Sequence, residues 1–225
     1  MLYLVPTPIG NLADVTYRAI DTLNFVDLIA CEDTRSSGVF LSHYGISTST
    51  ISYHNHNERS RAPQLIDRMK AGQQIALISD AGSPGLSDPG FYLVRLCWEE
   101  SIPVQALPGP TALIPALTAS GIPSERFVFE GFLPTRKGRN QRLEAIKLET
   151  RTVVLYESPH RLIRTLIDLI NLLGEQRVSV IAREITKKFE EISRGDLQTL
   201  LDKYHGESAI KGEFVIIIAP PKFTR

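Results

Sequence analysis

A rigid, glycine-rich segment follows one of the most apolar runs of the chain. It reads SDAGSPGLSDPG (residues 79–90) and comes directly after IALI, with three glycines, two prolines and an aspartate near each end. Glycine lets a backbone approach a bound group closely, and proline holds a turn in shape before binding. The segment lacks the lysine and spacing of a P-loop and is no GxGxxG fingerprint. It favours a small molecule of mixed charge over a nucleotide phosphate, with an ordinary Gly/Pro-rich turn as the alternative.

Two further rigid turns stand at comparable places. TPIGN (7–11) follows the apolar run LYLV, and ALPGPTA (106–112) comes at the end of PVQAL. In a parallel α/β sheet, ligands bind beyond the carboxyl ends of the strands. Three such turns on one edge of one sheet would outline a pocket. Asp80 is the acid nearest to it, and this side chain either holds a cationic group of the ligand or caps its own turn.

Acidic and imidazole side chains gather in two other places. CEDTR puts Glu32 and Asp33 after the apolar run LIAC, next to Arg35. These carboxylates are available for proton transfer, or they form a structural ion network with the arginine. YHNHNE brings His54 and His56 to the same side of an extended chain, but the other ligands of a metal site are missing. We therefore expect no metal.

Strand and helix patterns alternate through the first half of the chain. We expect strands at 2–5, 28–31, 50–52, 74–79 and 103–107, and helices at 17–25, 34–45, 58–72, 91–100 and 111–121. The strands are apolar throughout, which is typical of a parallel sheet covered on both faces. The sequence therefore predicts an N-terminal α/β lobe, residues 1–121, with a mostly parallel sheet and helices on both faces.

The second half has a different spacing. We expect strands at 127–133, 152–157, 177–183, 189–195 and 213–219, and helices near 139–149, 159–173 and 196–204. Several of these strands are close together in sequence, so a mixed or antiparallel sheet fits. A break near GIPSER (121–126) gives a C-terminal mixed α/β lobe, residues 122–225. A cleft between two lobes is a common place for a ligand.

Composition limits the class of protein. The chain has 225 residues, 43% of them hydrophobic and 22% charged, and a formal net charge of zero. It has enough apolar material for a core, and any nucleic-acid binding must rest on local patches. The two cysteines have no metal-ligand spacing and fit a reducing compartment, and no apolar run is long enough to span a bilayer. We expect a soluble, cytoplasmic protein without a membrane partner.

Several motifs together resemble the tetrapyrrole-methylase superfamily. They are TPIGNLADVT, CEDTR, SDAGSPGLSDPG, LPGPTA, GFLPTRKG, YESPHR, REITKKFEE and GEFVIIIA, and the resemblance runs from residue 2 to about 219. Within the superfamily they are similar to the bacterial branch that methylates the ribose 2′-oxygen of a cytidine in 16S ribosomal RNA. Porphyrin and cobalamin relatives carry a GxGPGD turn and a GGDP-type loop where this chain has PTPIGN and DAGSP, which favours RNA as substrate.

The resemblance implies a fold, a cofactor and partners. The fold is the two-lobed tetrapyrrole-methylase fold, the cofactor is S-adenosylmethionine, and the partners are the small ribosomal subunit and a second copy of the chain. The resemblance places cofactor contacts at Ile9, Ala81, Gly82, Ser83, Leu86, Thr111, Ala112, Tyr156 and Ile185, with Asp80 as a candidate for the ammonium group. Family members usually continue into a small helical C-terminal segment, which we expect to be absent after PPKFTR.

Methyl transfer to a hydroxyl needs alignment of the reacting groups and a base. No motif names that base. The candidates are Glu32, Asp33, His54, Glu157, His160 and Glu184, of which we favour Glu32, Asp33 and Glu184.

Basic residues in the second half are the candidates for RNA contacts. The segment TRKGRNQR (135–142) follows an expected strand and precedes an expected helix. A basic loop of this kind can hold phosphates, although a short charge cluster is more often only a solvated surface. The residues expected to contact RNA are Arg136, Lys137, Arg139, Arg142, His160, Arg161, Arg164, Lys187 and Lys188.

Two other functions remain open from the sequence. One is a methylase of a tetrapyrrole or another small molecule on the same fold. The other is a binding module without catalysis that senses the cofactor.

Overall fold

The first compact unit of the molecule is built on a parallel sheet. In the computed structural model, which describes residues 1–223, this unit spans Met1–Thr111. Its strands are ordered β3-β2-β4-β1-β5, and all neighbours are parallel. The strands are β1 (Leu2–Leu4), β2 (Leu28–Cys31), β3 (Thr50–Ser52), β4 (Ile75–Ile78) and β5 (Val104–Ala106). The helices are the short 3₁₀ helix η1 (Leu12–Asp14), α1 (Tyr17–Phe25), α2 (Thr34–His43), α3 (Glu58–Lys70) and α4 (Phe91–Glu99).

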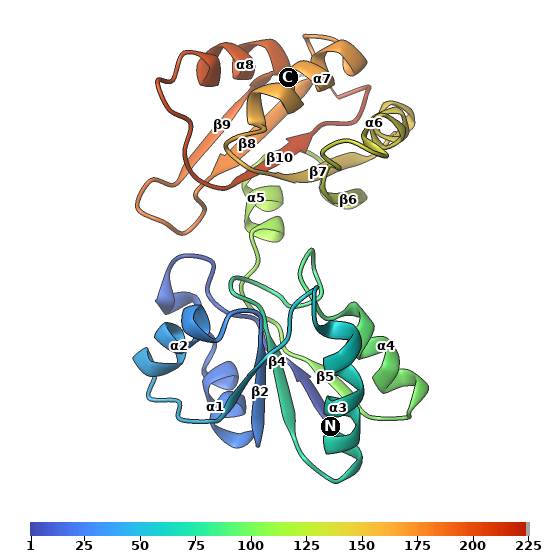
Figure 1. Cartoon of the computed structure of the whole chain (residues 1–225). Helices are drawn as coiled ribbons and strands as arrows, with labels where there is room; N and C mark the ends of the chain where they lie inside the picture. The colour runs from blue at the N-terminus through green and yellow to red at the C-terminus, as the bar shows by residue number, and fades with distance from the viewer. Residues whose placement is uncertain (224–225) are drawn as a thin grey trace. The chain divides into compact units, whose positions relative to one another are not determined.

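Helices cover both faces of this sheet, as Figure 1 shows, because successive residues of each strand point to opposite faces. Leu28 and Ala30 of β2 pack in a core cluster with residues of α3 and α4. Ile29 and Cys31 of the same strand pack in a second cluster with residues of α1 and α2. Both faces are therefore apolar, which explains the absence of polar alternation in these strands.

The second unit begins at Ala112 and contains a mixed sheet. Its strands are ordered β6-β7-β10-β8-β9, with β6 and β7 parallel and the other neighbours antiparallel. The strands are β6 (Phe127–Phe132), β7 (Thr152–Glu157), β8 (Val178–Arg183), β9 (Glu191–Asp196) and β10 (Phe214–Ile218). The helices are α5 (Leu113–Ala119), α6 (Arg139–Leu148), α7 (Leu162–Leu173) and α8 (Leu197–His205).

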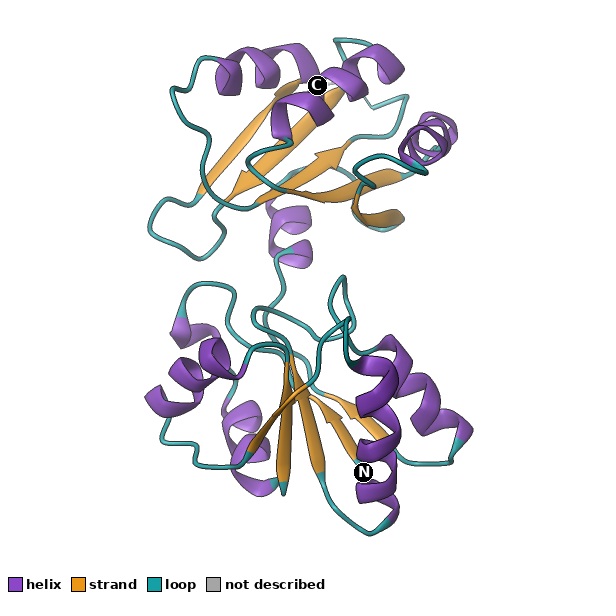
Figure 2. Cartoon of the chain, in the orientation of Figure 1, coloured by secondary structure: helices purple, strands orange, loops and turns teal. Residues whose placement is uncertain are grey.

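Three helices pack on one face of this second sheet. Leu166 of α7, Leu200 of α8 and Leu143 of α6 share a core cluster with Phe214 and Ile216 of β10. Helix α5 contacts β10 and lies on the opposite side of the sheet from α7 and α8, as Figure 2 shows.

The architecture confirms the predicted fold class, with one parallel and one mixed sheet. The division lies before α5, whereas the sequence placed this helix in the first lobe, because α5 packs against β10 of the second unit. Pro115 is the third residue of α5, where the missing N–H has no helical acceptor to lose. No sequence pattern predicted η1, which Asn11 caps.

Candidate functional site

Two of the predicted turns are joined at the carboxyl edge of the first sheet. The Thr7 N–H donates to the Gly82 carbonyl and the Gly82 N–H donates to the Thr7 carbonyl, both at 2.9 Å. The buried Thr7 hydroxyl also donates to the Ser79 carbonyl at 3.0 Å. The loops after β1 and β4 therefore hold each other in place.

The third turn, in the loop after β5, contacts the loop after β4. The Ser83 hydroxyl donates to the Pro110 carbonyl at 3.1 Å, which ties the loop after β4 to the loop after β5. A Cβ on Gly109 would lie 2.8 Å from the Pro6 Cβ, and one on Gly82 would lie 3.3 Å from the Ile9 side chain. These two glycines allow the loops to pack closely. The prediction that three rigid turns meet at one edge is confirmed.

A hollow of about 340 Å³ opens beside these loops. Hydroxyl groups, one carboxylate and apolar side chains share its wall. It is lined by Thr7, Pro8, Gly10, Leu12, Ser36, Ser37, Val39, Phe40, Ile78, Ser79 and Asp80. The hollow is formed entirely within the first unit, and Asp80 is the predicted cofactor contact that reaches it.

Carboxylates influence one another at this edge. Burial raises the pKa of Glu32, and the Asp80 charge adds to this while His54 opposes it. Burial also raises the pKa of Asp88 to about 6, with Glu32 and Asp80 contributing. No motif pointed to Asp88 as a functional residue. The available signal was its position near the end of the same rigid segment as Asp80.

Asp33 has a structural role in the described contacts. Its carboxylate caps α2 by accepting the Arg35 N–H at 2.8 Å and pairs with the Arg35 guanidinium at 2.8 Å. These bonds lower the pKa of Asp33 to about 2. The Asp33 N–H in turn donates to Asp80 Oδ1 at 3.2 Å. The structural alternative for Asp33 therefore accounts for its contacts, and a carboxylate this acidic is a poor base.

Glu184 joins two segments of the second unit. Its carboxylate accepts hydrogen bonds from Lys187 Nζ at 3.0 Å and from the Glu213 N–H at 2.9 Å. Partial burial works against ionisation of Glu184, but these two bonds outweigh it and lower its pKa. A Cβ on Gly212 would lie 2.5 Å from the Glu184 Cγ, so the glycine makes room for the carboxylate. Glu184 is thus better suited to holding the loop after β8 than to accepting a proton.

The other predicted cofactor contacts lie on both units. Ala81 is exposed and Leu86 is half-buried in the loop after β4, and Thr111 and Ala112 are half-buried where the two units adjoin in sequence. Tyr156 of β7 contacts the rings of Phe129 and Phe132 edge-on, with centroids at 4.9 and 5.7 Å. Ile185 is buried and lies between two non-glycine residues with positive φ, Glu184 and Thr186.

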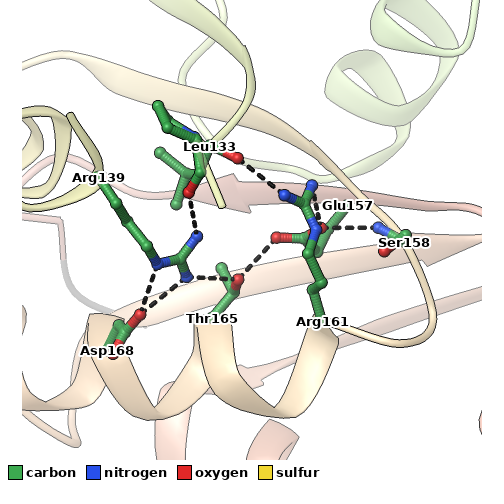
Figure 3. Close-up of polar contacts among 8 residues, drawn as sticks. Leu133, Arg139, Glu157, Ser158, Arg161, Thr165 and Asp168 are labelled. Atoms are coloured by element: carbon green, nitrogen blue, oxygen red, sulfur yellow. Dashed lines mark hydrogen bonds and ion pairs between the residues drawn. The ribbon is translucent and has the colours of Figure 1, made fainter. Parts of the chain in front are cut away.

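A buried polar network lies among the predicted RNA-binding residues of the second unit (Figure 3). The Arg139 side chain is 3% exposed and pairs with Asp168 at 2.8 Å. The Arg139 guanidinium also donates to the Thr165 hydroxyl at 2.9 Å and to the Pro134 carbonyl at 3.2 Å. Arg139 therefore has an internal structural role, and no sequence pattern distinguishes this arginine from its neighbours.

The Glu157 carboxylate extends the network. It accepts the Thr165 hydroxyl at 2.6 Å and the Ser158 N–H at 2.8 Å, and it pairs with Arg161 at 2.7 Å. Arg161 also donates to the Leu133 carbonyl at 2.9 Å. Glu157 is buried, and these partners give it a positioning role.

The remaining predicted RNA contacts differ in whether they form ion pairs within the protein. Arg142 pairs with Glu130 at 3.0 Å, and Lys187 pairs with Glu184 and Glu213. The exposed residues of the predicted set without an ion pair in the described part of the chain are Arg136, Lys137, His160, Arg164 and Lys188.

Two other kinds of feature are absent from residues 1–223. No group of three or more His, Cys, Asp or Glu side chains in this range is arranged to hold a metal ion. Across the same residues, every helix is too short or too polar to span a membrane.

Comparison with known proteins identifies the family. The model of the Tetrapyrrole (Corrin/Porphyrin) Methylases matches residues 1–201. A Synechocystis protein named Ribosomal RNA small subunit methyltransferase I is 54% identical over 97% of this chain and 78% of its own length. An Escherichia coli O157:H7 protein of the same name is 51% identical over 96% of this chain and 77% of its own.

Solved structures agree on the fold. The methyltransferase CobJ has a TM-score of 0.73 at 18% identity, over 100% of this chain and 95% of its own. Uroporphyrin-III C-methyl transferase from Thermus thermophilus, complexed with S-adenyl homocysteine, has a TM-score of 0.65 at 17% identity, over 96% of each chain. Identities this low support the fold alone, whereas the family model and the sequence relatives establish that this chain belongs to the tetrapyrrole methylase family.

Proposed function

We propose that this chain transfers a methyl group from S-adenosylmethionine to the ribose 2′-oxygen of a cytidine in the 16S RNA of the small ribosomal subunit. The observation that carries the proposal is the 54% identity over 97% of the chain to a protein named Ribosomal RNA small subunit methyltransferase I. The solved uroporphyrin-III C-methyl transferase and cobalt precorrin-4 methyltransferase share the fold at 16–17% identity, which gives no support for a tetrapyrrole substrate. The proposed setting is the cytoplasm, with the chain as a homodimer.

The loops at the carboxyl edge of the first sheet fit the chemistry of the cofactor. Asp80 offers an exposed carboxylate to an ammonium group, and Ile9 and Leu86 offer apolar surface to a purine ring. The hydrogen bonds between Thr7 and Gly82 fix these loops before any ligand arrives, which lowers the entropy cost of binding. When bound, S-adenosylmethionine supplies a methyl group on a sulfonium, whose transfer forms an O–C bond and leaves the S–C electron pair on sulfur. Tyr156 and Ile185 remain proposed contacts from the second unit.

Glu32 is the proposed base that takes the proton of the ribose hydroxyl. It directly follows β2, on the same edge as Asp80. Its pKa is raised by burial and by Asp80, whereas the pKa of Asp33 and that of Glu184 are lowered by their partners. A base with a raised pKa accepts a proton more readily near neutral pH.

A labelling experiment tests the proposal. The protein is incubated with methyl-labelled S-adenosylmethionine and small ribosomal subunits, and the RNA is then hydrolysed with alkali. A 2′-O-methyl group blocks the oxygen that attacks the neighbouring phosphate, so we expect the label in an alkali-resistant dinucleotide with cytidine at its 5′ side. Label released in ordinary mononucleotides contradicts the ribose assignment. No transfer to the RNA, with the cofactor bound, supports the binding-module alternative.

A further inference from the structure

Two exposed aromatic rings of the second unit each have a cationic side chain over them. The Phe132 ring, 50% exposed, lies 5.8 Å from the Arg161 guanidinium carbon. The Phe189 ring, 72% exposed, lies 5.6 Å from Lys188 Nζ. An exposed ring beside a cation combines the two groups that hold an unpaired base and its phosphate.

The topology of the second sheet brings both rings to one edge. Strand β7 is parallel to β6, and β7 and β8 are both antiparallel to β10, so β6, β7 and β8 run in the same direction. Their carboxyl ends therefore lie on the same edge. Phe132 ends β6, and Phe189 lies in the loop after β8. Three strand spacings separate β6 from β8, which is about 14 Å.

A β-bulge sets the direction of the Phe132 side chain. In a regular strand, residues three apart point to opposite faces. The register of β6 against β7 shifts between Phe129 and Gly131, and Gly131 has a φ of +62°. This shift lets Phe129 and Phe132 both contact the Tyr156 ring. Bulges of this kind often re-aim a side chain near a functional site.

The buried network holds the residues after Phe132 rigidly. Arg161 bonds to the Leu133 carbonyl and Arg139 bonds to the Pro134 carbonyl, while Glu157 and Asp168 fix the two guanidinium groups (Figure 3). The exposed cations Arg136 and Lys137 follow after Thr135. The network thus presents an aromatic ring and two free cations from one ordered segment.

The charges on this edge match a nucleic-acid strand. Arg136, Lys137, Arg164 and Lys188 are exposed and form no ion pair among residues 1–223. Of the acids, Glu157 pairs with Arg161, Glu184 and Glu213 share Lys187, and the exposed Glu190 accepts the Thr186 N–H. Cations hold phosphates, and aromatic rings stack on unpaired bases whatever their sequence. A double helix keeps its bases stacked on one another and offers the rings no base face.

We propose that Phe132 and Phe189 are stacking platforms for two unpaired bases of the RNA substrate, with the neighbouring cations on the phosphates. This inference rests on the proposed function, because it deepens the way in which that RNA is held. The occupant is single-stranded RNA, and the two rings place it along the carboxyl edge of β6, β7 and β8.

Ring-removal variants test the inference. Binding of a short labelled oligocytidylate is measured for Phe132→Ala, Phe189→Ala, Phe132→Leu and Phe132→Tyr, with thermal unfolding as a check on folding. We expect the alanine and leucine variants to bind about 5- to 100-fold more weakly, with an unchanged salt slope, because a stacking ring is lost and no charge is removed. Phe132→Tyr keeps the ring and should bind like the parent. Trp98→Ala removes a ring on α4 of the first unit that is about as exposed as Phe189, and this matched control should leave RNA binding unchanged.

Several results would overturn the inference. Parental RNA affinity in both alanine variants would show that the rings are not stacking platforms. Equal RNA binding by Phe132→Leu and Phe132→Tyr would show that apolar bulk is enough for binding and that stacking is not needed. Loss of S-adenosylmethionine affinity in Phe132→Ala with unchanged RNA affinity assigns the ring to the cofactor instead. Failure of the proposed function gives a different result. In that case the parent protein transfers no methyl group to ribosomal subunits, but its binding of oligocytidylate still depends on the two rings.

Discussion

The two sheets present contrasting carboxyl edges. At the edge of the first sheet, Glu32, Asp80 and Asp88 lie near one another, and backbone hydrogen bonds between Thr7 and Gly82 join the loops. At the edge of the second sheet, free cations accompany exposed rings, and Glu157 and Glu184 are bound in ion pairs. The contrast arises inside a chain with zero formal net charge.

The difference indicates a division of roles in the proposed reaction. An acid with a raised pKa suits proton transfer, and a carboxylate at the same edge suits recognition of a cationic ligand. Cations beside aromatic rings suit an RNA strand. A chain with zero net charge can therefore act on RNA without an overall excess of cations, because its free cations lie at one sheet edge and its acidic cluster at the other.

Removal of the proposed base should have the largest effect. Glu32→Gln keeps the shape of the side chain but cannot accept a proton, so we expect methyl transfer to fall by about 10²–10⁴-fold. In the parent protein, the rate should rise with pH through the raised pKa of Glu32, and this limb should vanish in the variant. Single-turnover transfer to small ribosomal subunits across pH measures both.

Two matched carboxylates provide the controls for this experiment. Asp33→Asn and Glu184→Gln should retain most of the parental rate, because their partners lower the pKa of each and leave it a weak base. A parental rate in Glu32→Gln, or an equal loss in either control, refutes the assignment of the base to the acidic edge.

Two arginines of the same basic segment should differ in their effect on stability. Arg139→Met leaves Asp168 and Thr165 without their buried partner, and we expect the free energy of unfolding to fall by about 3 kcal/mol. Arg136→Met removes an exposed side chain and should stay within about 0.5 kcal/mol of the parent. Chemical denaturation measures both values.

RNA binding separates the same two positions. Arg136→Glu combined with Lys137→Glu should weaken RNA binding, with cofactor affinity unchanged. The salt slope should fall by about 1 for each phosphate that the variant no longer neutralises. A stable Arg139→Met protein that binds RNA more weakly with a reduced slope would return Arg139 to the RNA surface.

The sequence predicted the elements of the fold well because its signals are local. The continuous apolar runs of β2 and β4 indicated a sheet buried on both faces, and the glycine-rich turns after β1, β4 and β5 do meet at one edge. The family model matches residues 1–201, a range that includes these turns. These features depend on residues that are close together in the sequence, so they can be predicted without a structure.

What the sequence missed depends on interactions between distant segments. Arg139 and Arg136 occupy the same basic segment, yet only the fold pairs Arg139 with Asp168 and leaves Arg136 in solvent. Glu32 and Asp33 are adjacent in sequence, yet Asp33 caps α2 whereas burial raises the pKa of Glu32. Helix α5 belongs to the second unit because it packs on β10, which no local pattern indicates.

The stability of the acidic edge should depend on pH through Asp88, with a smaller effect. Its folded pKa of about 6 lies above the ordinary value of 3.8, so the folded state binds this proton more tightly than the unfolded state. The resulting stabilisation is fully present below about pH 3.8 and is lost as pH rises through about 6. Because solvent screens part of this half-buried charge, Asp88→Asn should be more stable than the parent by about 1–2 kcal/mol at pH 7, and the advantage should shrink towards pH 4. Thermal unfolding of both proteins across this range measures the difference in stability. A difference that does not vary with pH would mean that Asp88 titrates like a solvent-exposed carboxylate, without the influence of burial or of the charges on Glu32 and Asp80.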